Sequence, residues 1–191
     1  MKYNQGFSLI EVLVTIVLTT VGILGMVALQ SKSIQYTQDA VNRNAVITLS
    51  NDLIETMRSY RDDLFVNKPP LAYSYTELLT ATDVYSADGA LTSKAADCPE
   101  STLAQTLKER AGCWFKQLEE TLPGSDEDDV KSAFKVCPSY EIDPDTNEPV
   151  CAGANYTGSM LAVQLAWRVK AGECMDNTTG TVCTYTVRVE L

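Results

Sequence analysis

The stretch Gly6-Phe7-Ser8-Leu9-Ile10-Glu11 opens a long apolar segment in this chain of 191 residues. A short polar leader with one lysine precedes it, and Glu11 is the only charged residue between Phe7 and Leu29. At 1.5 Å per residue, a helix over that segment is roughly 34 Å long, enough to span a hydrocarbon core of about 30 Å. A carboxylate inside such a segment costs on the order of 3 kcal/mol and usually marks a functional contact. The sequence therefore predicts a membrane-spanning helix with one functional acidic residue.

Two simpler interpretations of this segment compete with the functional one. A secretory signal peptide has an apolar region of about 7–15 residues, followed by a cleavage site made of small residues. Here the apolar run is longer, and no Ala-x-Ala site ends it. An ordinary single-pass anchor explains the length and composition of the segment, but it leaves Glu11 without a role.

Gly6, Phe7 and Glu11 together resemble the class III signal of type IV pilins and pseudopilins. The resemblance implies that a prepilin peptidase cleaves after Gly6 and that the new terminal residue, Phe7, is N-methylated. Glu11 then stands fifth in the mature chain, and its carboxylate pairs with the terminal amine of a neighbouring subunit. Removing one partner of a buried ion pair is strongly destabilising, so Glu11 is predicted to be an assembly contact.

Apolar residues continue at helical spacing beyond Leu29, and the positions between them, such as Asp39, are polar. The apolar positions are Ile34, Val41, Ala45, Leu49, Leu53 and Met57, with Val46 and Tyr60 beside them. This stripe predicts one helix from about residue 8 to 61, which ends near Asp62-Asp63 and packs its second half on a globular domain. A coiled coil is the competing interpretation, but the pattern does not sustain three heptads with charged flanks.

The length of the chain fits one anchor and one globular domain. The predicted parts are a leader at 1–6, a transmembrane or filament-core helix at 7–29, the amphipathic half of the same helix at 30–61, and a globular domain at 62–191.

Six cysteines lie beyond the membrane segment, and their even number implies disulfides formed in an oxidising compartment. A zinc site is the alternative, but it needs close pairs such as Cys-x-x-Cys, which do not occur in the sequence. Six cysteines can pair in many ways, and we expect the sequential arrangement. The expected disulfides are Cys98–Cys113, Cys137–Cys151 and Cys174–Cys183, each worth about 2–3 kcal/mol in the chain-entropy model.

A second helix is predicted to begin at Pro99-Glu100, because proline is favoured in the first turn of a helix. Pro123-Gly124 is predicted to end it. Its predicted apolar face consists of Leu103, Leu107, Ala111, Trp114, Phe115, Leu118 and Leu122. The two aromatic residues of this face are interpreted as core anchors rather than as a platform for a ligand.

Three stretches are interpreted as loops. Residues 66–97 have weak periodicity and are predicted to be a loop-rich connection with a short helical turn at 75–81. The acidic run at 125–129 is predicted to be a solvated loop, with an ion or partner contact as the alternative. Residues 143–147 resemble the front of a calcium loop, but the glycine at the sixth position and the glutamate at the twelfth are missing, so a tight turn between two strands is predicted.

The carboxy-terminal region has the clearest strand pattern, with apolar and polar residues alternating over 161–170 and 183–191. These strands are predicted to form an antiparallel hairpin closed by the Cys174–Cys183 disulfide. Its apolar face, which includes Trp167, is predicted to pack on the stripe of the long helix. The predicted fold class is therefore α+β and pilin-like, with a long amino-terminal helix packed on a disulfide-stapled antiparallel sheet.

The composition argues against several classes of function. The net charge is −10, so a nucleic-acid surface is not expected. The chain has no histidine, which is the commonest general base and the commonest metal ligand. No glycine-rich phosphate loop occurs either, so we expect a protein that is not an enzyme and that needs no metal or cofactor.

Within this family, the helix around Trp114, the strand bearing Trp167 and the segment 22–30 resemble minor pilins of the PilV type. The resemblance implies a single pass through the inner membrane with the domain in the periplasm, followed by entry into the pilus at or near its tip. The implied role is to help initiate type IV pilus assembly, which supports motility and adhesion. The implied partners are other minor pilins, the major pilin, prepilin peptidase, the inner-membrane assembly machinery and a tip adhesin.

Two alternatives from other classes stay open. A pseudopilin of a type II secretion system shares the amino-terminal signal, and a membrane-anchored periplasmic enzyme is the more remote alternative. The six cysteines and the acidic insert at 126–129 depart from the PilV-type pattern, so surface contacts of relatives need not transfer to this chain.

Overall fold

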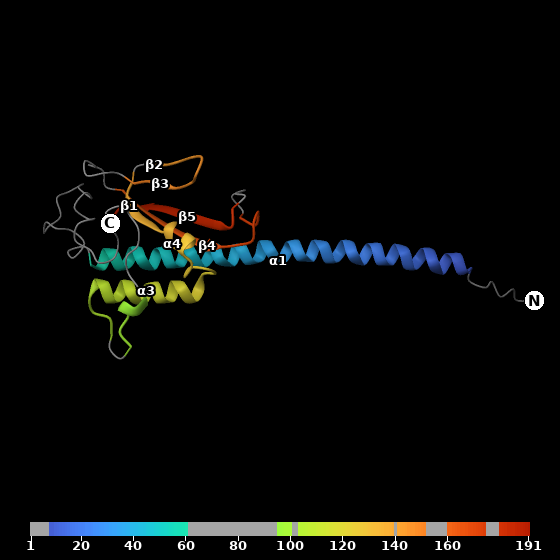
Figure 1. The fold of residues 1–191 in the computed structure, drawn as a ribbon, viewed down its shortest axis with the longest axis horizontal. Coiled ribbons are helices and arrows are strands. Elements are labelled where there is room, and N and C mark those ends of the chain that lie inside the picture. The colour runs from blue at the N-terminus through green and yellow to red at the C-terminus, as the bar shows by residue number, and fades with distance from the viewer. Residues whose placement is uncertain (1–7, 61–94, 101–102, 140, 152–159, 175–179) are drawn as a thin grey trace, which may run out of the picture. The chain divides into compact units, whose positions relative to one another are not determined.

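The computed structural model describes residues 8–60, 95–100, 103–139, 141–151, 160–174 and 180–191 (Figure 1). Its elements, in chain order, are α1 (Leu9–Ser59), the 3-10 helix η2 (Ala95–Asp97), α3 (Leu107–Thr121), α4 (Asp128–Ser132), β1 (Lys135–Pro138), β2 (Glu141–Ile142), β3 (Pro149–Val150), β4 (Leu161–Arg168) and β5 (Val182–Val189). The chain divides into two compact units, Met1–Gln38 and Asp39–Leu191, and α1 contributes residues to both.

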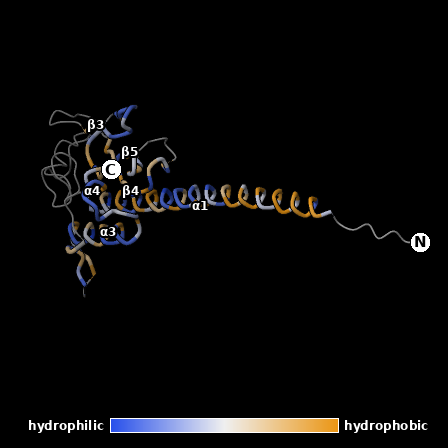
Figure 2. The backbone as a smooth tube through the Cα atoms, turned by 45° about the vertical axis from the view of Figure 1, so that its right-hand side comes forward, coloured by the Kyte–Doolittle hydropathy of each residue, from blue (hydrophilic) through white to orange (hydrophobic). Residues whose placement is uncertain are grey.

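The long helix is present as predicted, with bounds within two residues of the expected ones. It runs from Leu9 to Ser59 and is followed by a turn at Tyr60, whereas the predicted end at Asp62-Asp63 lies outside the described residues. In Figure 2 its amino-terminal part is mostly apolar, and polar turns follow before apolar and polar residues alternate. By length and composition, α1 is the one helix in the described part of the chain that could cross a membrane.

The buried face of α1 differs from the predicted stripe. Val46, Leu49, Leu53, Ile54 and Met57 are at most 4 % exposed, whereas Ile34 and Val41 are 58 % and 60 % exposed. The reason is geometric, because a spacing of four residues advances the stripe by about 40° around the helix at each step. The predicted stripe is spaced in fours from Val41 to Met57, so Val41 lies off the domain-facing side, as does Ile34 seven residues before it. The true face follows a spacing that alternates between three and four.

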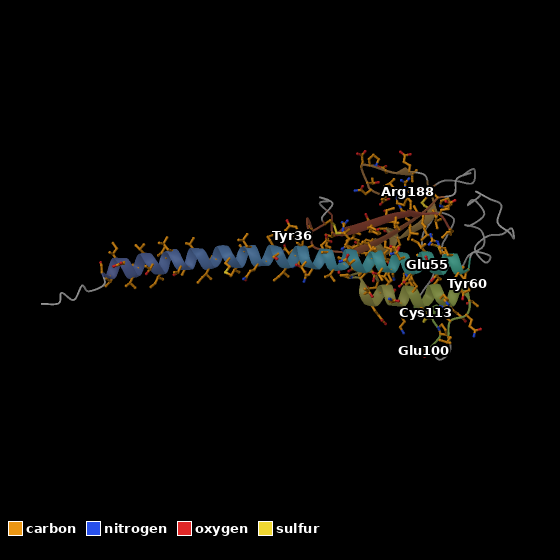
Figure 3. The ribbon with its side chains drawn as sticks, turned by 180° about the vertical axis from the view of Figure 1, so that it is seen from behind. Tyr36, Glu55, Tyr60, Glu100, Cys113 and Arg188 are labelled. Carbon is orange, nitrogen blue, oxygen red and sulfur yellow. A yellow bond between two sulfur atoms is a disulfide. The ribbon has the colours of Figure 1, made fainter. Side chains whose placement is uncertain are left out.

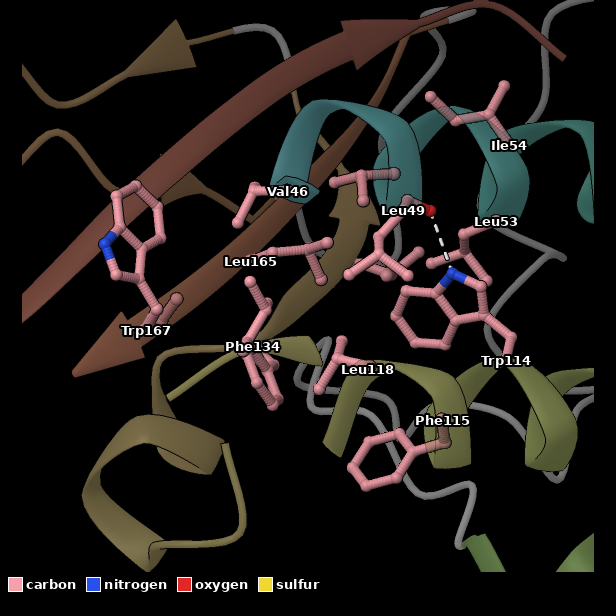
Figure 4. Packing of buried hydrophobic residues seen from close by; sticks show 14 of the residues in the cluster. Val46, Leu49, Leu53, Ile54, Trp114, Phe115, Leu118, Phe134, Leu165 and Trp167 are labelled. Carbon is pink, nitrogen blue, oxygen red and sulfur yellow. Dashed lines mark hydrogen bonds between the residues drawn. The ribbon is translucent and has the colours of Figure 1, made fainter. Parts of the chain in front are cut away.

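The carboxy-terminal half of α1 has packing partners on two sides. In the view of Figure 1, α3 lies on one side of it and the strands β1, β4 and β5 on the other. Figure 4 shows the side chains of these elements meeting around Leu49 and Leu165, with Leu118 and Phe134 among them. The predicted helix-on-sheet layer is confirmed, and α3 adds a second helix that the sequence analysis did not place against it.

The helix α3 is fixed to α1 by a hydrogen bond between buried groups. The indole Nε1–H of Trp114 donates to the backbone carbonyl of Leu49 at 2.8 Å, and Trp114 is 5 % exposed (Figure 4). The rings of Phe115 and Phe134 meet edge to face at a centroid distance of 6.3 Å. The prediction that the aromatic residues of this helix are core anchors is therefore confirmed.

The predicted start of the second helix is wrong. The helix begins at Leu107 rather than at Pro99-Glu100, and Leu103, which was expected on its apolar face, is 87 % exposed. The cause is a capping box, in which the Thr106 hydroxyl accepts from the Glu109 N–H and the Glu109 carboxylate accepts from the Thr106 N–H at 3.0 Å. The pattern Thr-x-x-Glu was visible in the sequence and outweighs the proline signal. Leu122 caps the other end, so Pro123-Gly124 follows the helix as predicted.

The predicted hairpin is present, and a third strand extends it. The strand order is β1-β4-β5 with both pairings antiparallel, and Trp167 lies opposite Cys183 in the register. Every residue of β4 from Leu161 to Trp167 is buried, including those on the face opposite Trp167. The alternating pattern predicts one covered face, but β4 is the central strand and both of its faces are covered.

Gln164 is the polar residue that β4 buries completely, and its amide is fully engaged. Its Nε2 donates to the carbonyl of Ala133 at 2.8 Å, and its Oε1 accepts from the hydroxyl of Thr186 at 2.8 Å. Burying such an amide is tolerated because both of its polar atoms have partners. Gln164 thereby connects the segment before β1 with β5 across the central strand.

The three disulfides have the sequential pairing. They join Cys98 to Cys113, Cys137 to Cys151, and Cys174 to Cys183, and every cysteine of the chain is paired. The last one closes the loop between β4 and β5, as expected for a stapled hairpin. The predicted loop over 66–97 is described only at Ala95–Asp97, which form η2, and the helical turn expected at 75–81 lies outside the described residues.

Gly112 should be required for the contact between α3 and the segment that contains Cys98. A Cβ atom at Gly112 would lie 2.7 Å from the Cβ of Asp97 and 2.8 Å from the backbone nitrogen of Cys98. We expect Gly112→Ala to lower the free energy of unfolding by about 1–3 kcal/mol through overpacking, despite the better helix propensity of alanine. Urea unfolding followed by circular dichroism measures the change.

Gly180→Ala is the matched control, because the nearest atoms to a Cβ there belong to Val182 at 3.9 Å, an ordinary van der Waals distance. Equal losses for both variants would show that the close approach at Gly112 has no energetic role.

Candidate functional site

Glu11 lies in the first turn of α1, among exposed side chains. Its backbone N–H donates to the carbonyl of Ser8 at 3.0 Å, so the helix is already formed at this residue. Neighbouring Leu9 and Ile10 are 83 % and 69 % exposed. A carboxylate in the first turn of a helix interacts favourably with the helix dipole, so the position of Glu11 in α1 is favourable for a negative charge.

The other polar side chains of this apolar segment are satisfied within the helix. The hydroxyls of Thr15, Thr19 and Thr20 each donate to the backbone carbonyl three residues earlier, at 2.8–2.9 Å. Glu11 has no side-chain hydrogen bond or ion pair within the described part of the chain. In an apolar environment this carboxylate is therefore the group that needs an external partner.

The other two residues of the amino-terminal motif, Gly6 and Phe7, lie outside the described residues. Their roles as cleavage site and methylated terminus therefore stay predictions, and so does the pairing of Glu11 with a terminal amine. The six cysteines, by contrast, are brought together in three pairs in the second unit.

Asp39 was expected among the outward polar residues of α1, but it is only 3 % exposed. Both of its carboxylate oxygens lack a hydrogen-bond partner within the described residues. Its position was readable from the sequence, because Asp39 precedes Val46 by two helical turns and so shares its face. A buried carboxylate without hydrogen bonds destabilises a fold, so Asp39 is a strained feature of this unit.

The acidic run at 125–129 is only in part the solvated loop that the sequence predicts, because its four acidic residues are exposed but its two ends are structured. Ser125 is 1 % exposed, and Asp128 and Asp129 begin the short helix α4. Arg168, at the end of β4, binds the carboxylates of both Asp129 and Glu127, the latter at 2.7 Å. The alternative prediction, that the acidic run makes a contact, is therefore the better one, and the contact is with Arg168 of the same chain. The alternating pattern of β4 predicts the strand but does not show which residue Arg168 binds.

The backbone reinforces this cluster. The N–H of Arg168 donates to the carbonyl of Pro123 at 2.7 Å, and its Nη1 donates to the hydroxyl of Thr181 at 3.3 Å. Hydrogen bonds from Arg168 hold the pKa of Asp129 below its ordinary value, and the charge of Arg168 acts in the same direction. Asp129 also raises the pKa of Arg168, so both groups are charged at neutral pH. The cluster fixes the start of α4 to the end of β4.

The calcium-like fragment forms a tight turn between β2 and β3, as predicted. One oxygen of Asp143 accepts from the backbone N–H groups of Asp145 and Thr146, at 2.8 and 3.2 Å. Asn147 adopts a positive φ of 56°, and the neighbouring Glu148 binds Lys135 at 2.6 Å. Within the described ranges, no three side chains of types that ligate metals gather at one point.

One arrangement in the chain has the spacing of a serine–lysine catalytic pair, Ser132 and Lys135. The Ser132 hydroxyl donates to the carbonyl of Asp129 at 2.8 Å, at the end of α4. The Lys135 ammonium is bound to Glu148 on the turn before β3. Each side chain is thus bound to another group, so the two are not arranged as a nucleophile and its base.

Comparison with known proteins gives one match, and it falls on the amino-terminal segment. Residues 1–27 match the model of the prokaryotic N-terminal methylation motif. No curated protein and no solved structure matches the chain. The matched residues contain the class III signal of the type IV pilin and pseudopilin superfamily, and the described fold, a long helix on an antiparallel sheet with three disulfides, is pilin-like.

The cluster around Arg168 predicts a change of stability with pH. Because the pKa of Asp129 is lowered in the folded chain, its contribution is present above the ordinary pKa and disappears as the pH falls below about 4. We expect Asp129→Asn to remove part of the loss of stability that the native chain shows on acidification. The effect is small, because the carboxylate is exposed to solvent.

Urea midpoints measured at neutral pH and near pH 3 for both proteins give the comparison. Asp128→Asn is the control, since Asp128 lies beside Asp129 in α4 but makes no contact with Arg168. A native chain and an Asp129→Asn variant with the same acid sensitivity would contradict the assignment.

Proposed function

We propose that this pilin-like chain is made as a prepilin and works as a minor subunit of a type IV pilus. The methylation motif over residues 1–27 is the observation that carries the proposal, because it stands at the start of an exposed apolar helix. In this proposal the leader 1–6 is removed by a prepilin peptidase, Phe7 is N-methylated, and residues 7–29 anchor the chain in the inner membrane.

The properties of the globular domain support export to the periplasm. All six cysteines are paired in disulfides, which form and persist in oxidising compartments. The amphipathic half of the helix, 30–61, joins the anchor to the globular domain, 62–191, in this proposal. From the periplasm the subunit enters the pilus and reaches the cell surface.

Glu11 supplies the assembly contact. It is the single charge of an apolar surface that would be buried between subunits, and it lacks a partner within the described chain. A terminal amine of a neighbouring subunit offers a charge of opposite sign at the same depth. Pairing the two removes the cost of burying either one unpaired, so Glu11 sets the axial position at which a subunit is accepted.

The finer assignment to minor pilins of the PilV type rests on resemblance. The helix that presents Trp114 to the core and the strand that carries Trp167 follow that pattern in the sequence. By this assignment the protein helps initiate assembly together with other minor pilins, lies at or near the tip, and contacts the major pilin and a tip adhesin. It acts as a structural subunit in motility and adhesion, not as an enzyme.

Deletion of the gene, with surface pili and secreted exoprotein counted in the same cells, tests this function. We expect fewer pili, unchanged secretion, and recovery of pili when the gene is restored. Lost secretion with normal piliation would instead identify the protein as a pseudopilin of a type II secretion system.

Replacing Glu11 by glutamine should separate membrane insertion from assembly. Glu11→Gln keeps the shape of the side chain but removes its charge, so we expect normal processing and insertion. Breaking a buried pair costs about 3–5 kcal/mol, so the amount of the protein in sheared pili should fall at least about tenfold. Immunoblots of membrane and pilus fractions measure both quantities.

Asp52→Asn is the matched control, because it removes an exposed carboxylate of the same helix outside the apolar segment. If Glu11→Gln enters pili as well as this control, Glu11 is not the assembly contact.

A further inference from the structure

The three disulfides differ in how deeply their sulfur-bearing residues are buried. Cys137 and Cys183 lie in strands of the sheet and are 0 % and 2 % exposed, and Cys174 is 6 % exposed. Cys98, Cys113 and Cys151 are partly exposed. Thiol–disulfide exchange requires that a thiolate reach a sulfur atom, and Cys98–Cys113 is the one disulfide in which both cysteines are partly exposed.

The Cys98–Cys113 bond holds a short segment against the outer side of α3. In Figure 3, Cys113 on α3 and Glu100 on this segment lie on the side of α3 that faces away from α1. Apart from the disulfide, η2 packs along α3, and its described contacts include the close approach of Asp97 to Gly112 and an ion pair of Asp97 with Lys108 at 3.9 Å. The disulfide is thus the strongest of the described links between the segment and α3.

The opposite side of α3 is held without this disulfide. Ala111, Trp114 and Leu118 are at most 5 % exposed, and the indole of Trp114 is hydrogen-bonded to the carbonyl of Leu49. The capping box of Thr106 and Glu109 closes the amino-terminal end of the helix. Opening the Cys98–Cys113 bond therefore leaves α3 docked and frees only the segment beside it.

The other two disulfides cannot open in this local way. Cys137 is paired in the ladder with Ala162 of the central strand, and Cys183 is paired with Trp167. Both β4 partners are completely buried. Cys151 is partly exposed, but attack there would leave Cys137 as a thiolate buried in the sheet, which is unfavourable unless the strands separate. Both cysteines of the Cys174–Cys183 bond are buried, so this bond is reached when the sheet opens.

We propose that the Cys98–Cys113 bond is a thiol–disulfide exchange site, by which a dithiol reductant releases the segment around residues 95–100 while the rest of the domain stays folded. In the first step a thiolate of the dithiol attacks one sulfur of the bond, forms a mixed disulfide and releases the other cysteine as a thiolate. The second thiol of the reductant then displaces the first cysteine. The dithiol ends as a cyclic disulfide, and Cys98 and Cys113 end as two thiols carrying the protons that the dithiol lost.

The Cys98–Cys113 bond and the amino-terminal assembly motif lie in different parts of the chain. Opening the bond changes the surface of α3 around Gly112, which the segment at Asp97 otherwise covers. The redox state of this bond therefore determines whether the surface of α3 is covered by the segment or accessible to a binding partner, while the domain is folded in both cases. The proposal does not depend on whether the protein works in a pilus or in a secretion system.

Graded reduction of the full-length protein in detergent tests the proposal. Dithiothreitol is added under native conditions, free thiols are blocked with N-ethylmaleimide at intervals, and peptide masses identify the labelled cysteines. We expect Cys98 and Cys113 to be labelled at least tenfold faster than the other four. Hydrogen–deuterium exchange of the singly reduced protein should rise in the peptide covering 95–100 and stay unchanged in β4.

Two double variants provide the matched comparison. Cys98→Ser with Cys113→Ser should keep the exchange protection of β4 and β5, whereas Cys174→Ser with Cys183→Ser should reduce it. The proposal is overturned if all six cysteines are labelled at one rate, if reduction at Cys98 exposes β4, or if the Cys98/Cys113 double variant does not fold.

Discussion

The hydrogen bond from the Trp114 indole to the carbonyl of Leu49 stands in the middle of the surface on which the domain is built. It joins α3 to α1. The buried face of α1, which includes Leu49 and Leu53, also packs against the sheet. Each large apolar side chain buried there contributes about 1.5–3 kcal/mol. Neither α3 nor the three-stranded sheet has a complete core without that face, so α1 is the element on which the other described elements depend.

The amino-terminal half of α1 lies outside the core of the domain and is suited to a different, apolar environment. From Leu9 to Leu29 its apolar side chains have no cover within the described chain, and Glu11 is the single charge among them. An exposed surface of this size is tolerated only in a membrane or against other protein surfaces. The composition of α1 therefore assigns its two ends different tasks, because its first half fits lipid or neighbouring subunits while its second half organises a stapled domain.

Much of this organisation is readable from the residues, and the errors have identifiable causes. The long helix and the hairpin follow from strong periodicity, whereas the sequence does not select one of the possible cysteine pairings, and the expected sequential arrangement is the one present. The start of α3 was misplaced because a proline was weighed above the capping box at Thr106. The burial of Asp39 can be inferred from its seven-residue spacing to Val46, but the Arg168 cluster cannot, because contacts between distant residues leave no local pattern. The cover on the second face of β4 was missed for the same reason.

We propose that the amino-terminal motif makes this chain a processed, membrane-anchored pilin-like subunit. The mass of the amino-terminal peptide, measured on protein taken from the cells that produce it, tests this proposal directly. We expect a peptide that begins at Phe7 and carries one N-methyl group. A mature chain that still begins at Met1, or one cut beyond the apolar segment as in a secretory signal peptide, would contradict it.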